Sequence, residues 1–202
     1  GYGNAINIMR TVREFENAGV SGMIFEDQLS PKKCAACANR IELLGVEEAV
    51  GKIRAAVEAR QNPDTIIIAR TDEVDEDAAI ARAKLYVEAG ADLIQPISRC
   101  FRDIGGLRRL REACGVPLSL QILGWLESDL SADDIKEVAG LACYPLVGLM
   151  SAAKVLQDNF SALAIDLGTK NLPQPKMSMD EFKSFIGFTE VEQQQERFLL
   201  TE

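Results

Sequence analysis

One segment of this chain has the composition of a strand that is buried on both faces. Residues 65–70 read Thr-Ile-Ile-Ile-Ala-Arg, a β-branched run without alternation of polar and apolar side chains. Strands of this kind are typical of parallel sheets, because helices cover both faces of such sheets. Further runs with strand character lie at residues 22–27, 91–96, 116–123 and 141–145. The sequence therefore predicts a parallel sheet.

Helical patterns separate the predicted strands. Apolar residues recur at helical spacing over residues 8–15 and 46–57. Acids at residues 75–77 are placed to open the next helix, whose positive dipole end favours them. Further helices are expected at residues 104–113, 131–139 and 147–163. This repetition indicates an α/β fold, either an open doubly wound sheet or a (β/α)8 TIM-type barrel.

The barrel is the favoured closure because polar side chains recur where the predicted strands end. In a barrel the carboxyl ends of all strands form one rim, where active sites lie. The residues concerned are Glu26, Asp27, Arg70, Asp72, Ser98 and Gln121. A full barrel takes about 250 residues, whereas this chain has 202 and begins with a loop-like Gly1-Tyr2-Gly3-Asn4. We therefore expect it to lack roughly the first three βα units.

The last part of the chain has a different character. Pro173 and Pro175 mark a helix stop and a linker. Ser178 and Glu181 then form a capping-box pattern at the start of a helix, and a last polar helix is expected over residues 190–199. We predict a partial barrel domain over residues 1–170 and a helical tail over residues 171–202. Its phenylalanines pack either on the chain's own barrel or on a second subunit.

Composition excludes several classes of function. The formal net charge of −9 disfavours nucleic acid as a partner, because phosphate binding needs a basic surface. No apolar run approaches the roughly 20 residues of a membrane span. Five cysteines without a regular framework suggest a reducing compartment, for which we predict the cytoplasm. The chain has no histidine, so the Cys34–Cys37 pair is not expected to bind zinc.

The stretch from Phe25 to Cys34 has a layout for chemistry on an anionic substrate. It places Glu26 and Asp27 at the end of a strand, and Lys32, Lys33 and Cys34 on the following loop. Simpler interpretations of the same residues stay open. In these, Glu26 and Asp27 are ordinary polar residues at a strand end, and Cys34 is an incidental loop thiol. Arg70 is then an internal ion-pair partner of Glu26 or Asp72, while Asp72 caps the following turn.

Several short motifs together carry a family resemblance. They read Gly1-Tyr2-Gly3-Asn4, Ala18-Gly19-Val20, Glu26-Asp27-Gln28, Lys32-Lys33-Cys34, Ile68-Ala69-Arg70-Thr71-Asp72, Glu88-Ala89-Gly90-Ala91-Asp92 and Tyr144-Pro145-Leu146. In this order and spacing, the chain resembles the isocitrate lyase and phosphoenolpyruvate mutase superfamily. The likeness is greatest to short-chain lyases and hydrolases of the 2-methylisocitrate, 2,3-dimethylmalate and oxaloacetate type.

The resemblance implies a barrel enzyme that cleaves a carbon–carbon bond in a small α-hydroxy or α-keto dicarboxylate. It also implies Mg2+ or Mn2+ and a homo-oligomer, a dimer or tetramer, with exchanged C-terminal helices. Much of the family's metal site precedes the Gly-Tyr-Gly loop. The candidate residues are Cys34, Lys32 and Arg70 for catalysis, Glu26 for the metal, and Tyr2, Gly3, Asn4, Lys33 and Gln121 for substrate binding.

The chain also departs from the family pattern. The loop normally reads Cys-Gly-His, and here it reads Cys34-Ala35-Ala36. Ile97 stands where a glutamate is usual, and Met150 stands near an expected arginine. The next strand end, normally Asn and then Thr-Glu, carries Gln121, Leu123 and Gly124. A carbon–carbon lyase or hydrolase is therefore predicted beside two alternatives, a phosphonate-handling relative of the mutase type and a non-catalytic subunit or binding module.

Overall fold

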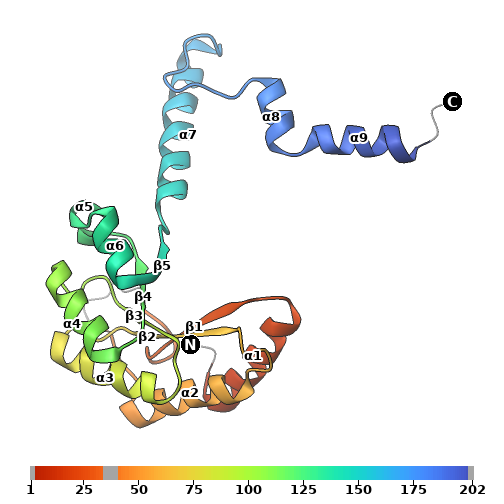
Figure 1. The fold of residues 1–202 in the computed structure, drawn as a ribbon. Coiled ribbons are helices and arrows are strands. Elements are labelled where there is room, and N and C mark those ends of the chain that lie inside the picture. Colours follow the sequence, from red (N-terminus) through yellow and green to blue (C-terminus); the bar gives the residue numbers. More distant parts are fainter. Residues whose placement is uncertain (1–2, 34–40, 200–202) are drawn as a thin grey trace. The chain divides into compact units, whose positions relative to one another are not determined.

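The computed structural model describes residues 3–33 and 41–199, whose fold is shown in Figure 1. The chain forms two compact units, residues 1–146 and 147–202. Each unit is described by itself. The domain boundary expected after residue 170 stays a prediction.

Five parallel strands form the sheet of the first unit. They are β1 (Gly22–Glu26), β2 (Ile66–Thr71), β3 (Leu93–Pro96), β4 (Leu118–Gln121) and β5 (Ala139–Cys143), and they neighbour one another in chain order. A doubly wound sheet reverses its strand order at a switch point, and the described strands show no reversal. The α/β fold with a parallel sheet is thereby confirmed, and the doubly wound alternative is wrong for these strands.

The two faces of the sheet differ in what covers them. Helix α2 (Val46–Ala59) packs against β1 and β2, and α3 (Glu76–Glu88) packs against β2 and β3 (Figure 1). Phe25, Ile67 and Ile94 point to this side and belong to the buried core. We call it the helix face. The opposite face, which we call the site face, carries Ile24 and Ile66 with about two fifths of their surface exposed.

Local signals explain where most helices begin. Asn4 caps α1 (Ala5–Asn17) in a capping box with Asn7, and Asp75 caps α3 by accepting from the Ala78 amide at 2.9 Å. Asp72 was expected to cap this turn, and that expectation is wrong. Asp103 caps α4 (Ile104–Cys114), which ends at Gly115 with a φ of +69°.

The region around β4 and β5 differs from the sequence prediction. The short helix α5 (Trp125–Asp129) was not foreseen, because five residues show no helical periodicity. It is tied down by the Trp125 indole, which donates to the Ser98 carbonyl at 2.8 Å. Strand β5 begins at Ala139, directly after α6 (Ala132–Val138), where the prediction extended the helix. Gly140 permits this start, because a Cβ there would lie 2.9 Å from Pro117.

The second unit consists of helices. They are α7 (Val147–Asp166), α8 (Met179–Phe185) and α9 (Phe188–Phe198), and the predicted capping box of Ser178 and Glu181 at α8 is confirmed. Asn159 bonds to the backbone of Gln174 and so holds the linker to α7. None of these helices has a buried residue among those described. In the described part of the chain, no helix is both long and apolar enough to cross a membrane.

Candidate active site

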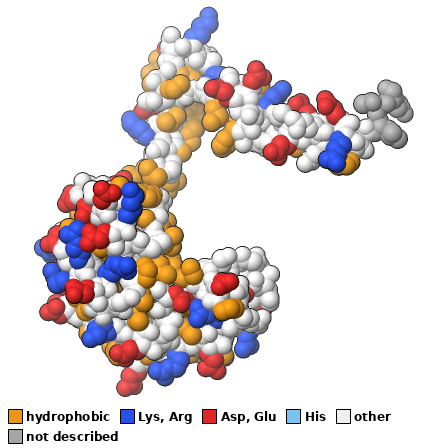
Figure 2. Space-filling view, in the orientation of Figure 1, with side chains coloured by type: hydrophobic (Ala, Val, Ile, Leu, Met, Phe, Trp, Pro, Cys, Tyr) orange, Lys and Arg blue, Asp and Glu red, His pale blue; other side chains and the backbone are white. Residues whose placement is uncertain are grey.

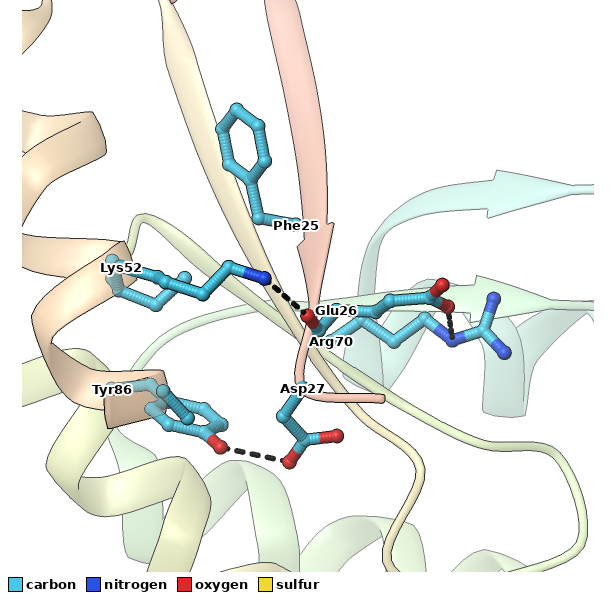
Figure 3. Close-up of a pocket in the computed structure, with 8 residues that line it drawn as sticks. Phe25, Glu26, Asp27, Lys52, Arg70 and Tyr86 are labelled. Atoms are coloured by element: carbon cyan, nitrogen blue, oxygen red, sulfur yellow. Dashed lines mark hydrogen bonds and ion pairs between the residues drawn. The ribbon is translucent and has the colours of Figure 1, made fainter. Parts of the chain in front are cut away.

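The adjacent carboxylates of Glu26 and Asp27 point to opposite sides of the sheet. Successive side chains of a strand alternate between its faces. In Figure 3 the Glu26 and Arg70 side chains extend together, away from Lys52 and Tyr86, which come from the helices. Asp27 instead turns toward Tyr86. The acidic pair that the sequence places together therefore divides into two groups with different surroundings.

Asp27 is the centre of a buried hydrogen-bond network on the helix face. It accepts from the Thr71 hydroxyl at 2.8 Å, the Asp72 amide at 2.9 Å and the Tyr86 hydroxyl at 2.8 Å. The Arg82 guanidinium lies 3.3 Å away and completes the network. Burial first, and then the neighbouring Asp27 carboxylate, raise the pKa of Tyr86. With its oxygens engaged in this way, Asp27 holds β1, β2 and α3 together.

Lys52 approaches the same strand ends from α2. Its side chain is buried, and Nζ donates to the backbone carbonyl of Glu26 at 3.3 Å. Burial lowers the pKa of Lys52, although the charges of Glu26, Glu48 and Asp27 oppose this shift. The space between Lys52, Tyr86 and the ends of β1 and β2 has no room for a water molecule. It is a packed support for the strand ends and not a substrate cavity.

On the site face, a cluster of charges surrounds Arg70. The Arg70 Nε donates to Asp72 Oδ1 at 2.7 Å, and Nη2 donates to Asp72 Oδ2 at 3.2 Å. Glu26 Oε2 lies 3.6 Å from Arg70 Nε and accepts from Lys32 Nζ at 2.8 Å. The Asp72 carboxylate is itself fixed by Gln28 Nε2 at 2.6 Å. The structure thus brings together three of the predicted site residues, Glu26, Lys32 and Arg70.

This cluster fixes the orientation of the Arg70 guanidinium. Asp72 engages Nε and Nη2, while Nη1 has no hydrogen-bond partner in the part of the chain that the structure describes. The internal ion pair considered from the sequence is therefore present, with both Glu26 and Asp72. An arginine held on one edge retains donors with which to meet a carboxylate.

The polar row continues through Gln95 and Ser119, two residues that the sequence analysis did not single out. Gln95 on β3 is the register partner of Arg70, and Ser119 on β4 donates to Gln95 Oε1 at 2.8 Å. Both residues are 1% exposed. The available signal was a polar residue among buried apolar ones in each strand. Glu26, Arg70, Gln95 and Ser119 therefore form one row across β1 to β4.

The other predicted site residues have different surroundings. Gly3 has a φ of +78°, and a Cβ there would collide with Asn7. Asn4 caps α1, with its side-chain oxygen accepting from the amides of residues 6 and 7. Lys33 forms an exposed ion pair with Glu42 at 3.1 Å. Gln121 is the last residue of β4, beside Cys143 of β5. Tyr2 and Cys34 lie outside the described residues.

A metal ion would need more ligands than this cluster supplies. Among residues 3–33 and 41–199, no three Asp, Glu, Cys or His side chains are grouped to hold one. Glu26 is the predicted ligand, and its carboxylate already accepts from Lys32. The described residues alone therefore do not fit a complete metal site.

Comparisons with known proteins find relatives over nearly the whole chain. The family model described as phosphoenolpyruvate phosphomutase matches residues 1–143. A 2,3-dimethylmalate lyase of Eubacterium barkeri is 36% identical over 196 residues, which are 95% of this chain and 67% of that protein. The oxaloacetate decarboxylase of Pseudomonas aeruginosa strain LESB58 is 38% identical over 192 residues, 92% of this chain and 65% of that protein.

This chain belongs to the phosphoenolpyruvate mutase and isocitrate lyase superfamily. The resemblance seen in the sequence motifs is thereby confirmed. A phosphonopyruvate hydrolase crystallised with oxalate and Mg2+ has the same fold, with a TM-score of 0.83 and 28% identity over 99% of this chain and 70% of the other. The chain spans about two thirds of the length of the curated relatives that it matches.

The superfamily membership accounts for the position of the charged cluster. In α/β barrel enzymes, active sites are built at the carboxyl ends of the strands. Glu26 ends β1, and Arg70 is the second-last residue of β2. The cluster therefore lies at the carboxyl end of the sheet, which is where α/β barrel enzymes in general build their active sites.

Proposed function

We propose that this chain carries part of the active site of an enzyme that cleaves a carbon–carbon bond in a small α-hydroxy or α-keto carboxylate. The observation that carries the proposal is the part-buried Arg70 guanidinium, oriented by Asp72 and placed beside the Glu26–Lys32 pair. Relatives named as a dimethylmalate lyase and an oxaloacetate decarboxylase support this substrate class. The fold we propose is a TIM-type barrel of which these five strands are a part.

The proposed reaction is a retro-aldol or retro-Claisen cleavage. A base removes the proton of the substrate hydroxyl, which in a keto acid is a hydroxyl of the hydrate formed when water adds to the carbonyl. The oxygen becomes a carbonyl oxygen as the carbon–carbon bond breaks, and the electron pair of that bond remains on the leaving fragment as an enolate. Arg70 binds a carboxylate of the substrate through its free Nη1 edge. The Cys34 thiol donates a proton to the carbanionic carbon, and the ammonium groups of Lys32 and Lys33 hold its thiolate form at low energy afterwards.

Mg2+, or Mn2+ in its place, belongs to the proposal because a related hydrolase was crystallised with Mg2+. Such an ion would supply charge stabilisation for the developing enolate. Glu26 is the described residue we propose to hold it, directly or through water, together with groups outside the described residues. Mg2+ is usually held by one or two carboxylates and several waters, so a single carboxylate is a reasonable contribution.

We also propose that the protein assembles as a homo-oligomer. Large apolar side chains of the second unit are exposed, and Figure 2 shows them at its surface. Examples are Leu149 at 68%, Phe160 at 62% and Phe185 at 73% exposure. A second copy of the chain would remove such side chains from water. The thiols of Cys100, Cys114 and Cys143 are free, in keeping with the reducing, cytoplasmic location that we propose.

A phosphonate substrate is the second candidate. It is favoured by the similarity to a phosphonopyruvate hydrolase and by the name of the matching family model. The Lys32-Lys33-Cys34 loop favours the carbon–carbon lyase, because the phosphonate-handling branches of the family generally lack that cysteine. A non-catalytic role is the third candidate and rests on Ile97, Met150 and Gly124, which replace polar family residues.

The test is turnover by the full protein with Mg2+ on a panel of four acids. The panel contains 2,3-dimethylmalate, 2-methylisocitrate, oxaloacetate and phosphonopyruvate, and the products followed are pyruvate, oxalate, phosphoenolpyruvate and phosphate. We expect turnover of a carbon–carbon substrate that is lost in Cys34→Ser. The matched control is Cys114→Ser, a thiol at the end of helix α4, before β4 begins, which should keep full activity in the folded protein. Turnover of phosphonopyruvate alone would establish the second candidate, and no turnover by the folded protein would support the third.

A further inference from the structure

We propose that Gln95 is a specificity-determining residue of this site, whose side-chain Nε2 donates a hydrogen bond to an acceptor oxygen of the bound acid. The inference rests on the proposed function, because it assigns a binding role within the same site. It names the substrate class more closely: a small keto or hydroxy acid with a second oxygen beside the carboxylate that Arg70 receives.

The first argument is that the Gln95 amide is buried with a donor unused. Gln95 is 1% exposed, and its Nε2 is the buried side-chain polar atom that has no hydrogen-bond partner in the described part of the chain. Native proteins pair nearly all buried polar groups, so an unpaired one calls for an explanation. A ligand oxygen that arrives on binding is such an explanation, because the donor is then paired in the complex.

The second argument is that the amide is oriented. The Ser119 hydroxyl donates to Gln95 Oε1 at 2.8 Å, and Ser119 is 1% exposed. This bond occupies the acceptor end of the amide and leaves the donor end for another group. A group whose rotamer is fixed before binding loses little freedom when the ligand arrives. Ser119 therefore acts as a positioning residue for Gln95.

The third argument is the place of Gln95 in the polar row. Arg70 is paired in register with Glu26 on one side and with Gln95 on the other, so all three side chains lie on the site face. Neighbouring strands lie about 4.8 Å apart. That spacing is similar to the distance between oxygens at the two ends of a small keto or hydroxy acid. An acid bound to Arg70 can therefore present a second oxygen to Gln95.

The charge of the row fits such a ligand. Arg70 is cationic and meets a carboxylate, whereas Gln95 and Ser119 are neutral and can only donate or accept hydrogen bonds. A neutral donor discriminates by the presence of an acceptor at a given position, since an analogue without that acceptor leaves the buried donor unpaired. Gln95 is thus suited to recognise a carbonyl, hydroxyl or carboxylate oxygen and to reject an apolar substituent there.

The experiment uses the full protein with oxalate and Mg2+ as the probe and isothermal titration as the readout. The variants are Gln95→Leu, which removes the amide at similar volume, and Gln95→Glu, which keeps an acceptor for Ser119 and removes the donor. Arg70→Lys tests the proposed function itself, and Gln61→Leu on the exposed surface is the control for this type of change.

We expect both Gln95 variants to weaken oxalate binding by about tenfold or more, with Gln95→Glu the weaker binder because it adds a negative charge. Gln95→Leu leaves the buried Ser119 hydroxyl without its acceptor, so the free variant should be somewhat less stable than the parent, whereas Gln95→Glu keeps that acceptor. Unchanged oxalate affinity in both variants would overturn the inference, since Nε2 would then not meet the bound acid. Binding that depends on Arg70 and not on Gln95 refutes the inference alone. If the unsubstituted protein binds no oxalate, or its Arg70 and Gln95 variants all bind as well as the parent, the proposed function fails as well.

Discussion

Replacing Asp27 by asparagine separates structural from chemical roles at the end of β1. Asp27 is 2% exposed and accepts hydrogen bonds from Thr71, the Asp72 amide and Tyr86. Asparagine keeps the side-chain volume and one acceptor oxygen, but it removes the negative charge that faces Arg82. Its NH2 group is also a donor, and it replaces an oxygen that accepted from the surrounding donors. The substitution therefore acts on the network and leaves the packing in place.

The magnitude follows from the burial of both partners. The Arg82 side chain is 13% exposed and lies 3.3 Å from the carboxylate. Removing one partner of a buried ion pair costs about 3–5 kcal/mol, and we expect the lower end here because Arg82 keeps its hydrogen bonds to the Leu44 carbonyl and the Tyr86 hydroxyl. A domain has only about 5–15 kcal/mol of stability in total. We expect Asp27→Asn to lose a large part of the free energy of unfolding, with a matching fall in the urea midpoint.

Glu26→Gln is the matched variant, one residue away on the site face. Glu26 pairs with Lys32, whose side chain is half exposed, and Arg70 keeps its bonds to Asp72 when Glu26 is neutral. Because Lys32 reaches water and Arg70 keeps Asp72, the urea midpoint should fall by less than in Asp27→Asn, while turnover falls. The reasoning is refuted if Asp27→Asn unfolds at the parent midpoint, or if it stays folded and loses turnover while Glu26→Gln does not.

Three further predictions follow from the described residues. Burial lowers the pKa of Lys52 below its ordinary value of 10.5. Between the lowered pKa and 10.5, the unfolded chain therefore binds more protons than the folded chain. The contribution of Lys52 to the free energy of unfolding rises with pH in that window. The stability of Lys52→Met relative to the parent should therefore fall as pH rises toward 10.5, and a pH-independent difference in urea midpoint would contradict this. Burial raises the pKa of Cys100 to about 12 and that of Cys114 to about 11, so at pH 8 a thiol reagent should modify Cys143 rapidly and these two only on unfolding. Equal rates by mass spectrometry would show that the two thiols are accessible. Chelation of divalent ions should abolish turnover, and added Mg2+ should restore it; turnover that survives chelation would remove the metal from the proposal.

Much of the fold follows from the sequence because its signals are local. The β-branched run that forms β2 and the capping residues of α3 and α8 act within a few positions of themselves. The ion pair of Glu26 with Arg70 could also be predicted from the sequence, since both residues lie at the carboxyl ends of neighbouring predicted strands. Family motifs drew attention to these two residues before their contact was known.

The features of the site that could not be predicted from the sequence depend on which face of the sheet a side chain occupies. Alternation alone did not decide which of Glu26 and Asp27 points to the helices, because both are acids at a strand end. Gln95 and Ser119 were missed because each is a single polar residue within an apolar strand, and the register of β3 against β2 is a long-range property. The expectation that Asp72 caps the following turn was wrong because its carboxylate accepts hydrogen bonds from Arg70 instead.

The most direct test of the central claim is the kcat/KM of Arg70→Lys on the substrate that the panel identifies. Lysine keeps the positive charge but lacks the planar fork that meets Asp72 and a carboxylate at once. We predict a loss of roughly 10- to 150-fold, the equivalent of a charge-assisted hydrogen bond of about 1.5–3 kcal/mol. Arg108→Lys, in an exposed ion pair with Glu137 on the surface, should retain the parent value. An Arg70→Lys protein with the parent kcat/KM would contradict the account, because Arg70 would then be only an internal ion-pair partner.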